Sequence, residues 1–175
     1  AEVKRFLKQG RALLAQYSSE IQTMAGTLYP EALDDLGLMT AIKAHVRGFN
    51  ERHGIEVRLD LPPDLSRLPA EHELTLFRVM EEALSNACRH SGSKTATVRV
   101  FCDALEVGLE VIDAGRGMPL LARPATGDSA KSTGIQEIRE RMRNLGGRLE
   151  IASGGGGTTV RAVLPFVPRQ SETPR

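Results

Sequence analysis

The first 28 residues carry apolar side chains at a period of 3.5 residues, the spacing of helices that pack side by side. One seam repeats every seven residues and a second seam lies beside it: Leu7, Leu14, Ile21 and Leu28, then Val3, Gly10, Tyr17 and Met24. A helix of this length would span about 42 Å and would need a partner for its apolar seam. Two packings are open, a helix folded back on its own domain and an intermolecular bundle. We favour the bundle because the pattern runs from the start of the chain to Pro30.

After Pro30 the pattern changes to shorter amphipathic helices and alternating strands. Helices are expected over about residues 36–49, 70–90 and 133–145, and strands over residues 55–61, 97–102, 105–113, 148–152 and 158–164. A tight hairpin turn is expected at Asp103, and a left-handed glycine cap at Gly146-Gly147 is expected to end the last helix. This order predicts an α+β fold, a two-layer α/β sandwich preceded by the long bundle-forming helix. We expect three parts: the helix over residues 1–30, a globular domain over residues 31–166, and a flexible tail over residues 167–175.

Composition narrows the classes of function. The 175 residues have a formal charge of +1, only 4% aromatic residues and no Trp, which disfavours a nucleic-acid partner. No apolar run is long enough to span a membrane, so we expect a cytoplasmic protein, with any membrane contact made by a segment outside this chain. Cys88 and Cys102 have no metal-ligand spacing and are expected to be reduced thiols. Because the chain begins at Ala1 within a running helical pattern, we expect it to be part of a longer protein.

The helix expected over residues 70–90 carries a polar cluster near its end. Glu82 and Asn86 are four residues apart and Arg89 is three further on, so all three are predicted to share one face, with His90 at its edge. A carboxylate, an amide oxygen and a cation arranged in this way suit a phosphorylated ligand with a bound metal ion. The alternative is an ordinary solvated helix face.

Three further motifs follow in the sequence. Asp113 ends a strand before Gly115 and Gly117, where a carboxylate could accept a hydrogen bond from the amine of adenine and the glycines would let the backbone approach the base. The triplet 132–134, Ser-Thr-Gly, opens a helix whose free N–H groups could bind phosphate. Thr158 follows a run of four glycines. Each motif alone is a weak signal.

Together, in this order and spacing, the four motifs resemble the GHKL (Bergerat-type) ATP-binding fold. The likeness is greatest to sensor histidine kinases related to the nitrate and lipid-desaturase sensors. Residues 82–90 resemble the N-box of that subfamily, residues 113–118 its first glycine box, residues 134–141 with 145–147 its lid-helix signature, and residues 153–158 its final glycine-threonine turn. Residues 28–42 resemble the end of its dimerisation hairpin.

The resemblance assigns roles to these positions. It implies ATP and Mg²⁺ as cofactors, with Asn86 as the metal ligand and Glu82 as the polar or general-base partner. Residues 118–133 would form the lid over the nucleotide. The other expected ATP-binding residues are Arg89 and His90 toward the phosphates, Asp113 with Thr158 at the adenine, Gly115 and Gly117 beside it, and Ser132, Thr133 and Gly134 at the lid.

In such kinases the γ-phosphoryl group of ATP passes to a histidine on a dimeric helical hairpin and then to an aspartate of a response regulator. The resemblance therefore implies a response-regulator partner and a homodimer formed through the helical bundle. Residues 1–30 would be the second helix of that hairpin, and the full-length protein could be anchored in the inner membrane.

The sequence departs from the subfamily at two positions and in one absence. Ser132 stands where the lid motif has its first glycine, and Ala114 stands where Asn is frequent. The acceptor is expected either on a segment outside this chain or to be missing from the protein, because none of the four histidines has the context of a phosphoacceptor: His45, His53, His72 and His90. Two other readings stay open, an ATP-driven switch that acts on a protein partner without histidine transfer, and a scaffold that binds no nucleotide.

Overall fold

The computed structural model describes residues 31–117 and 133–166. The predictions for residues 1–30, for residues 118–132 including Ser132, and for the tail lie outside these ranges. The described elements follow the order α2 (Glu31–His53), β1 (Glu56–Asp60), α3 (Ala70–Asn86), the π-helical turn η1 (Ala87–Ser91), β2 (Thr95–Cys102), β3 (Glu106–Asp113), α4 (Thr133–Asn144), β4 (Arg148–Gly154) and β5 (Gly157–Pro165).

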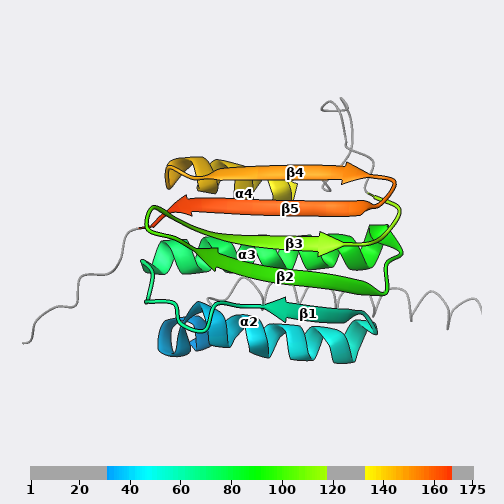
Figure 1. The fold of residues 1–175 in the computed structure, drawn as a ribbon, viewed down its shortest axis with the longest axis horizontal. Coiled ribbons are helices and arrows are strands. Elements are labelled where there is room, and N and C mark those ends of the chain that lie inside the picture. The colour runs from blue at the N-terminus through cyan, green and yellow to red at the C-terminus, as the bar shows by residue number, and fades with distance from the viewer. Residues whose placement is uncertain (1–30, 118–132, 167–175) are drawn as a thin grey trace, which may run out of the picture. The chain divides into compact units, whose positions relative to one another are not determined.

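The strands form one five-stranded sheet in the order β1-β2-β3-β5-β4 (Figure 1). β1 pairs with β2 in parallel, whereas the other three pairs are antiparallel. Helices α3 and α4 lie behind the sheet in the view of Figure 1, so one face of the sheet is covered by helices. The predicted α+β two-layer sandwich is confirmed.

The core lies between the helices and the covered face of the sheet. The apolar face predicted for residues 36–49 lies on α2 and is buried. Its side chains belong to the same cluster as the inward-facing side chains of α3 and the strands; they are Leu38, Ile42, Val46 and Phe49. This helix begins earlier than predicted, at Glu31, and is broken at Gly37, where φ is +77°. Glycine reaches that left-handed conformation without the steric cost that a side chain would add.

Two connections agree with the turns expected from the sequence. Asp103 accepts hydrogen bonds at Oδ1 from the backbone N–H groups of Leu105 and Glu106, both at 2.8 Å, and so closes the β2–β3 hairpin. Helix α4 ends in a left-handed Gly146 (φ +72°), and the N–H of Gly147 donates to the carbonyl of Met142. This is the glycine cap predicted there.

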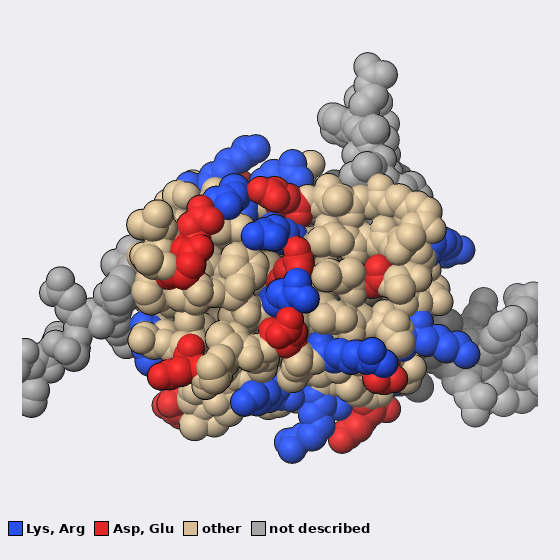
Figure 2. Space-filling view, viewed as in Figure 1, with Lys and Arg blue, Asp and Glu red and all other residues tan. Residues whose placement is uncertain are grey.

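The face of the sheet opposite the helices carries a row of alternating charges. In the strand register, Asp60, Arg99, Glu110, Arg161 and Glu150 lie side by side across all five strands. Ion pairs join the first four: Arg99–Asp60 at 2.6 Å, Arg99–Glu110 at 3.6 Å and Arg161–Glu110 at 3.5 Å. Figure 2 shows the blue and red side chains alternating across the middle of this face. The first four charges of the row are therefore paired with one another on the face opposite the helices.

Candidate functional site

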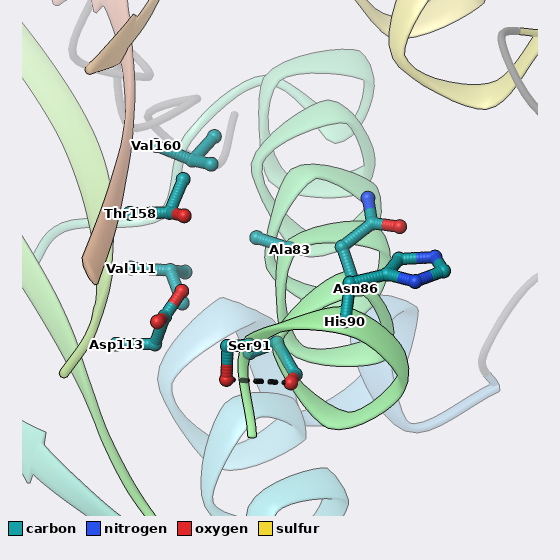
Figure 3. Close-up of a pocket in the computed structure, with 9 residues that line it drawn as sticks. Ala83, Asn86, His90, Ser91, Val111, Asp113, Thr158 and Val160 are labelled. Atoms are coloured by element: carbon teal, nitrogen blue, oxygen red, sulfur yellow. Dashed lines mark hydrogen bonds between the residues drawn. The ribbon is translucent and has the colours of Figure 1, made fainter. Parts of the chain in front are cut away.

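A small hollow opens between the end of α3 and the adjoining ends of β3 and β5. Figure 3 shows the helix on one side and the two strands on the other. Its walls are largely apolar and its polar groups lie at separate positions: the lining residues are Ala83, Asn86, Ala87, His90, Ser91, Val111, Asp113, Thr158 and Val160. Flat apolar walls with a few polar groups are typical of a small-molecule site.

The strand side of the hollow holds Asp113 and Thr158. These residues are paired in the β3–β5 register, and both are 6% exposed. The backbone N–H of Gly115 donates to Oδ1 of Asp113 at 2.9 Å, which fixes the direction of the carboxylate. The Thr158 hydroxyl lies 3.2 Å from the Ser153 hydroxyl. The structure therefore brings together the two residues that the sequence predicted for the adenine end.

The helix side holds Asn86 and Glu82. The amide nitrogen Nδ2 of Asn86 donates to Oε1 of Glu82 at 3.0 Å, so the amide oxygen of Asn86 is left for another partner. A β-carbon at Gly134 would lie 3.0 Å from the Glu82 carboxylate, so the start of α4 fits against Glu82 because residue 134 has no side chain. Three predicted site residues from two helices thus meet at one place. The side chain of Thr133 is outside what the structure describes.

Arg89 and His90, the polar residues that follow Asn86, lie in the π-helical turn η1 and not in a continuous α-helix. His90 lines the hollow and lies beside Asn86 in Figure 3, whereas Arg89 is exposed and is not part of the lining. The sequence predicted that Arg89 would share the face of Glu82 and Asn86, with His90 at its edge. Arg89 is therefore not brought to the hollow with Asn86, and its place on the face of Glu82 and Asn86 stays a prediction.

Gly115 and Gly117 were expected to let the backbone approach a ligand, but both have close neighbours within the chain. A β-carbon at Gly115 would lie 2.3 Å from the carbonyl oxygen of Ser91, and one at Gly117 would lie 2.2 Å from that of Gly154. Ser91 was not singled out from the sequence, and Ser153 entered only as the first residue of the 153–158 motif. Their contacts with Gly115 and Gly117 join segments far apart along the chain, which no local motif signals.

Oxygen donors at this site suit a magnesium ion better than a transition metal. No group of three or more His, Cys, Asp or Glu side chains that could hold a metal ion occurs within residues 31–117 and 133–166. Mg²⁺ commonly takes one or two protein oxygens and completes its shell with water and phosphate oxygens. The amide oxygen of Asn86 fits that pattern.

Two of the described histidines pack as structural residues. The His45 ring lies against Phe49 and Phe77, with ring centroids 6.2 and 5.5 Å apart, and His53 lies against Phe49 at 4.5 Å. The two free cysteines, Cys88 and Cys102, are half-buried. None of the described helices is long and apolar enough to cross a membrane.

Comparison with known proteins identifies clear relatives. Residues 71–168 match the model of the histidine kinase-, DNA gyrase B- and HSP90-like ATPase family. Over 146 residues the chain is 36% identical to the sensor histidine kinase MctS of Rhizobium johnstonii. That alignment covers 83% of this chain and 31% of MctS, so the chain spans about a third of the length of that relative.

Solved structures show the same fold. The histidine kinase domain of a blue-light-activated histidine kinase from Erythrobacter litoralis aligns with a TM-score of 0.60 and 25% identity, over 73% of this chain and 60% of that one. The Acinetobacter baumannii histidine kinase AdeS aligns with a TM-score of 0.62 at 13% identity, over 89% of this chain and 82% of that one.

Proposed function

The chain belongs to the histidine kinase-, DNA gyrase B- and HSP90-like ATPase family, and from this premise we propose that it is the catalytic region of a two-component sensor histidine kinase. It binds Mg·ATP and passes the γ-phosphoryl group to a histidine on a segment outside this chain, for relay to an aspartate of a response regulator. The observation that carries the proposal is that Asp113 and Asn86 face one apolar hollow from opposite sides.

Different residues of the hollow bind different parts of the nucleotide. Asp113, buried and held by the Gly115 N–H, accepts a hydrogen bond from the exocyclic amine of adenine, with Thr158 beside it. The side chains of Val111 and Val160 provide apolar surface for the base. The phosphates then extend toward Asn86 and His90, with the exposed Arg89 as the predicted contact of an outer phosphate oxygen.

Asn86 is the residue that would hold Mg²⁺, through its amide oxygen. A bound Mg²⁺ would neutralise charge on the terminal phosphates, the main electrostatic requirement of phosphoryl transfer. Glu82 orients the Asn86 amide through the 3.0 Å hydrogen bond and acts as the polar or general-base partner. Gly134, at the start of α4 beside Glu82, would lie near the phosphates.

The wider assignments rest on the family likeness. Residues 31–166 form the catalytic domain, and residues 1–30 form the second helix of a dimerisation hairpin through which the full-length protein makes a homodimer. The chain works in the cytoplasm, and any membrane anchor lies elsewhere in the full-length protein.

Asp113→Asn tests the adenine assignment directly. Asn keeps an oxygen that can accept from the Gly115 N–H, but it places an NH₂ group where the adenine amine needs an acceptor. We expect ATP affinity, measured by calorimetry, to fall at least tenfold, about 1.4 kcal/mol.

The matched control is Asp103→Asn, the same change at the exposed β2–β3 hairpin, where the aspartate also accepts backbone N–H groups. It should bind ATP like the unmodified chain. Equal affinities for the Asp113 variant and the unmodified chain would refute the assignment.

A further inference from the structure

Helix α3 does not end as an α-helix but widens into the π-helical turn η1 over Ala87–Ser91. The turn follows Asn86 directly and ends at Gly92 in a left-handed conformation, with φ +70°. Single π-turns within helices are costly and are frequent at functional sites. Something in the structure must therefore hold the turn open.

Ser91 supplies that support. It is 4% exposed, and its hydroxyl donates to the carbonyl of Ala87 at 2.7 Å (Figure 3). The same hydroxyl oxygen accepts the backbone N–H of Ser93 at 2.9 Å. A single side chain thus joins the start of the π-turn to the segment that leaves it.

The far side of the π-turn contacts the turn that follows Asp113. The backbone N–H of Arg116 donates to the carbonyl of Ser91 at 3.0 Å, and Nε of Arg116 donates to the carbonyl of His90 at 3.0 Å. Gly115 lies flat against Ser91, since a β-carbon there would be 2.5 Å from the Ser91 β-carbon. The Gly115 N–H in turn holds Oδ1 of Asp113.

These contacts form a continuous path from the helix to the carboxylate: the Ser91 hydroxyl fixes the π-turn, the π-turn fixes the 115–116 turn, and that turn orients Asp113. We propose that Ser91 is a positioning residue for base selectivity, setting the place of the Asp113 carboxylate relative to Asn86 without touching the nucleotide's amine itself. The inference rests on the proposed function and adds to it a residue that determines the preference for an amine-bearing purine.

The readout is the ratio of affinities for ATP and for inosine triphosphate, which has a carbonyl in place of the adenine amine. A misplaced Asp113 weakens binding of ATP but not of inosine triphosphate, because only ATP uses that carboxylate as an acceptor. For Ser91→Ala we expect the ratio to fall at least fivefold, through loss of ATP affinity alone. A residue with a merely structural role would change thermal stability, or both affinities, and leave the ratio intact.

Ser93→Ala is the matched control. The Ser93 hydroxyl donates to the carbonyl of Thr95 at 2.7 Å and accepts the Thr95 N–H at 3.2 Å, so these hydrogen bonds stay within the same connection. This variant should keep the ratio of the unmodified chain.

Gly115→Ala probes the contact between Ser91 and the 115–116 turn from the opposite side. The added methyl group would displace Ser91, so this variant should also lower the ratio of ATP affinity to inosine triphosphate affinity.

The outcomes distinguish a failure of the role of Ser91 from a failure of the proposed function. An unmodified chain that prefers ATP, together with a Ser91→Ala protein that folds and keeps that preference, would overturn the role of Ser91 and leave the proposed function standing. An equal loss of affinity for both nucleotides would also overturn it. An unmodified chain that binds neither nucleotide would contradict the proposed function and the inference together.

Discussion

Asn86 carries two chemically different groups, and its surroundings separate their tasks. The NH₂ group is used by Glu82, one helical turn earlier, at 3.0 Å. The oxygen is not used by Glu82, and Asn86 lines the hollow that Asp113 closes from the other side. Removing the side chain should therefore affect the metal-dependent part of nucleotide binding more than the part that depends on the base.

Asn86→Ala tests this division. We expect ATP affinity in the presence of Mg²⁺ to fall about tenfold or more, and affinity in the presence of a chelator to change much less, because the lost oxygen serves the metal. Calorimetric titration under both conditions gives the comparison. Asn50→Ala is the control, since Asn50 accepts the N–H of Val57 at 3.2 Å outside the hollow. Equal losses with and without Mg²⁺ would exclude Asn86 as a metal ligand.

At this scale the sequence predicts the residues whose chemistry is local to a motif. Asp113 at a strand end and Glu82 one turn before Asn86 are candidates from local spacing, and the family resemblance implies their roles. Ser91 cannot, because its importance comes from contact with Gly115, 24 positions away along the chain. The role of Gly115 itself was predicted as an approach to the ligand, whereas the structure places Ser91 against it.

At the scale of elements, α2 and α3 pack around a buried ionisable cluster. His45 of α2 is enclosed by the rings of Phe49 and Phe77, and its Nδ1 lies 3.5 Å from Oε1 of Glu81 on α3. Burial lowers the pKa of His45 to about 4, and the charges of Arg52 and His53 act in the same direction. Burial also raises the pKa of Glu81, against the effect of its 2.8 Å ion pair with Arg78.

His45→Phe should therefore alter the acid sensitivity of the fold. Between pH 6.5 and about 4, His45 binds a proton in the unfolded chain but not in the folded chain. The free energy of unfolding therefore falls as the pH is lowered through this range. Phe removes this contribution and suits the aromatic surroundings. From pH 7 to pH 5 the variant should lose roughly 1–2 kcal/mol less stability than the unmodified chain, as measured by urea unfolding. Parallel losses in the two proteins would contradict the account.

Element types were more predictable than their geometry. Alternation of apolar residues located the strands within one or two residues, and the glycine cap located the end of α4. The parallel pairing of β1 with β2 and the π-turn after Asn86 depend on contacts between distant segments. Helical periodicity continues through residues 87–90 in the sequence, so nothing local indicates that the helix widens there.

At the scale of the whole described domain, the two faces of the sheet have different tasks. One face carries the row of alternating charges from Asp60 to Glu150, in which ion pairs join the first four residues (Figure 2). The other face, covered by helices, provides the core and, at the ends of β3 and β5, the hollow. A nucleotide bound there would contact α3, η1 and both strands at once, so binding should depend on the intact fold.

The most direct test of the central claim is calorimetric titration of the unmodified chain with ATP, in the presence and absence of Mg²⁺. The account predicts binding that Mg²⁺ strengthens, with a dissociation constant on the micromolar scale, about −8 kcal/mol. Absence of ATP binding under both conditions, in a chain shown to be folded, would contradict it.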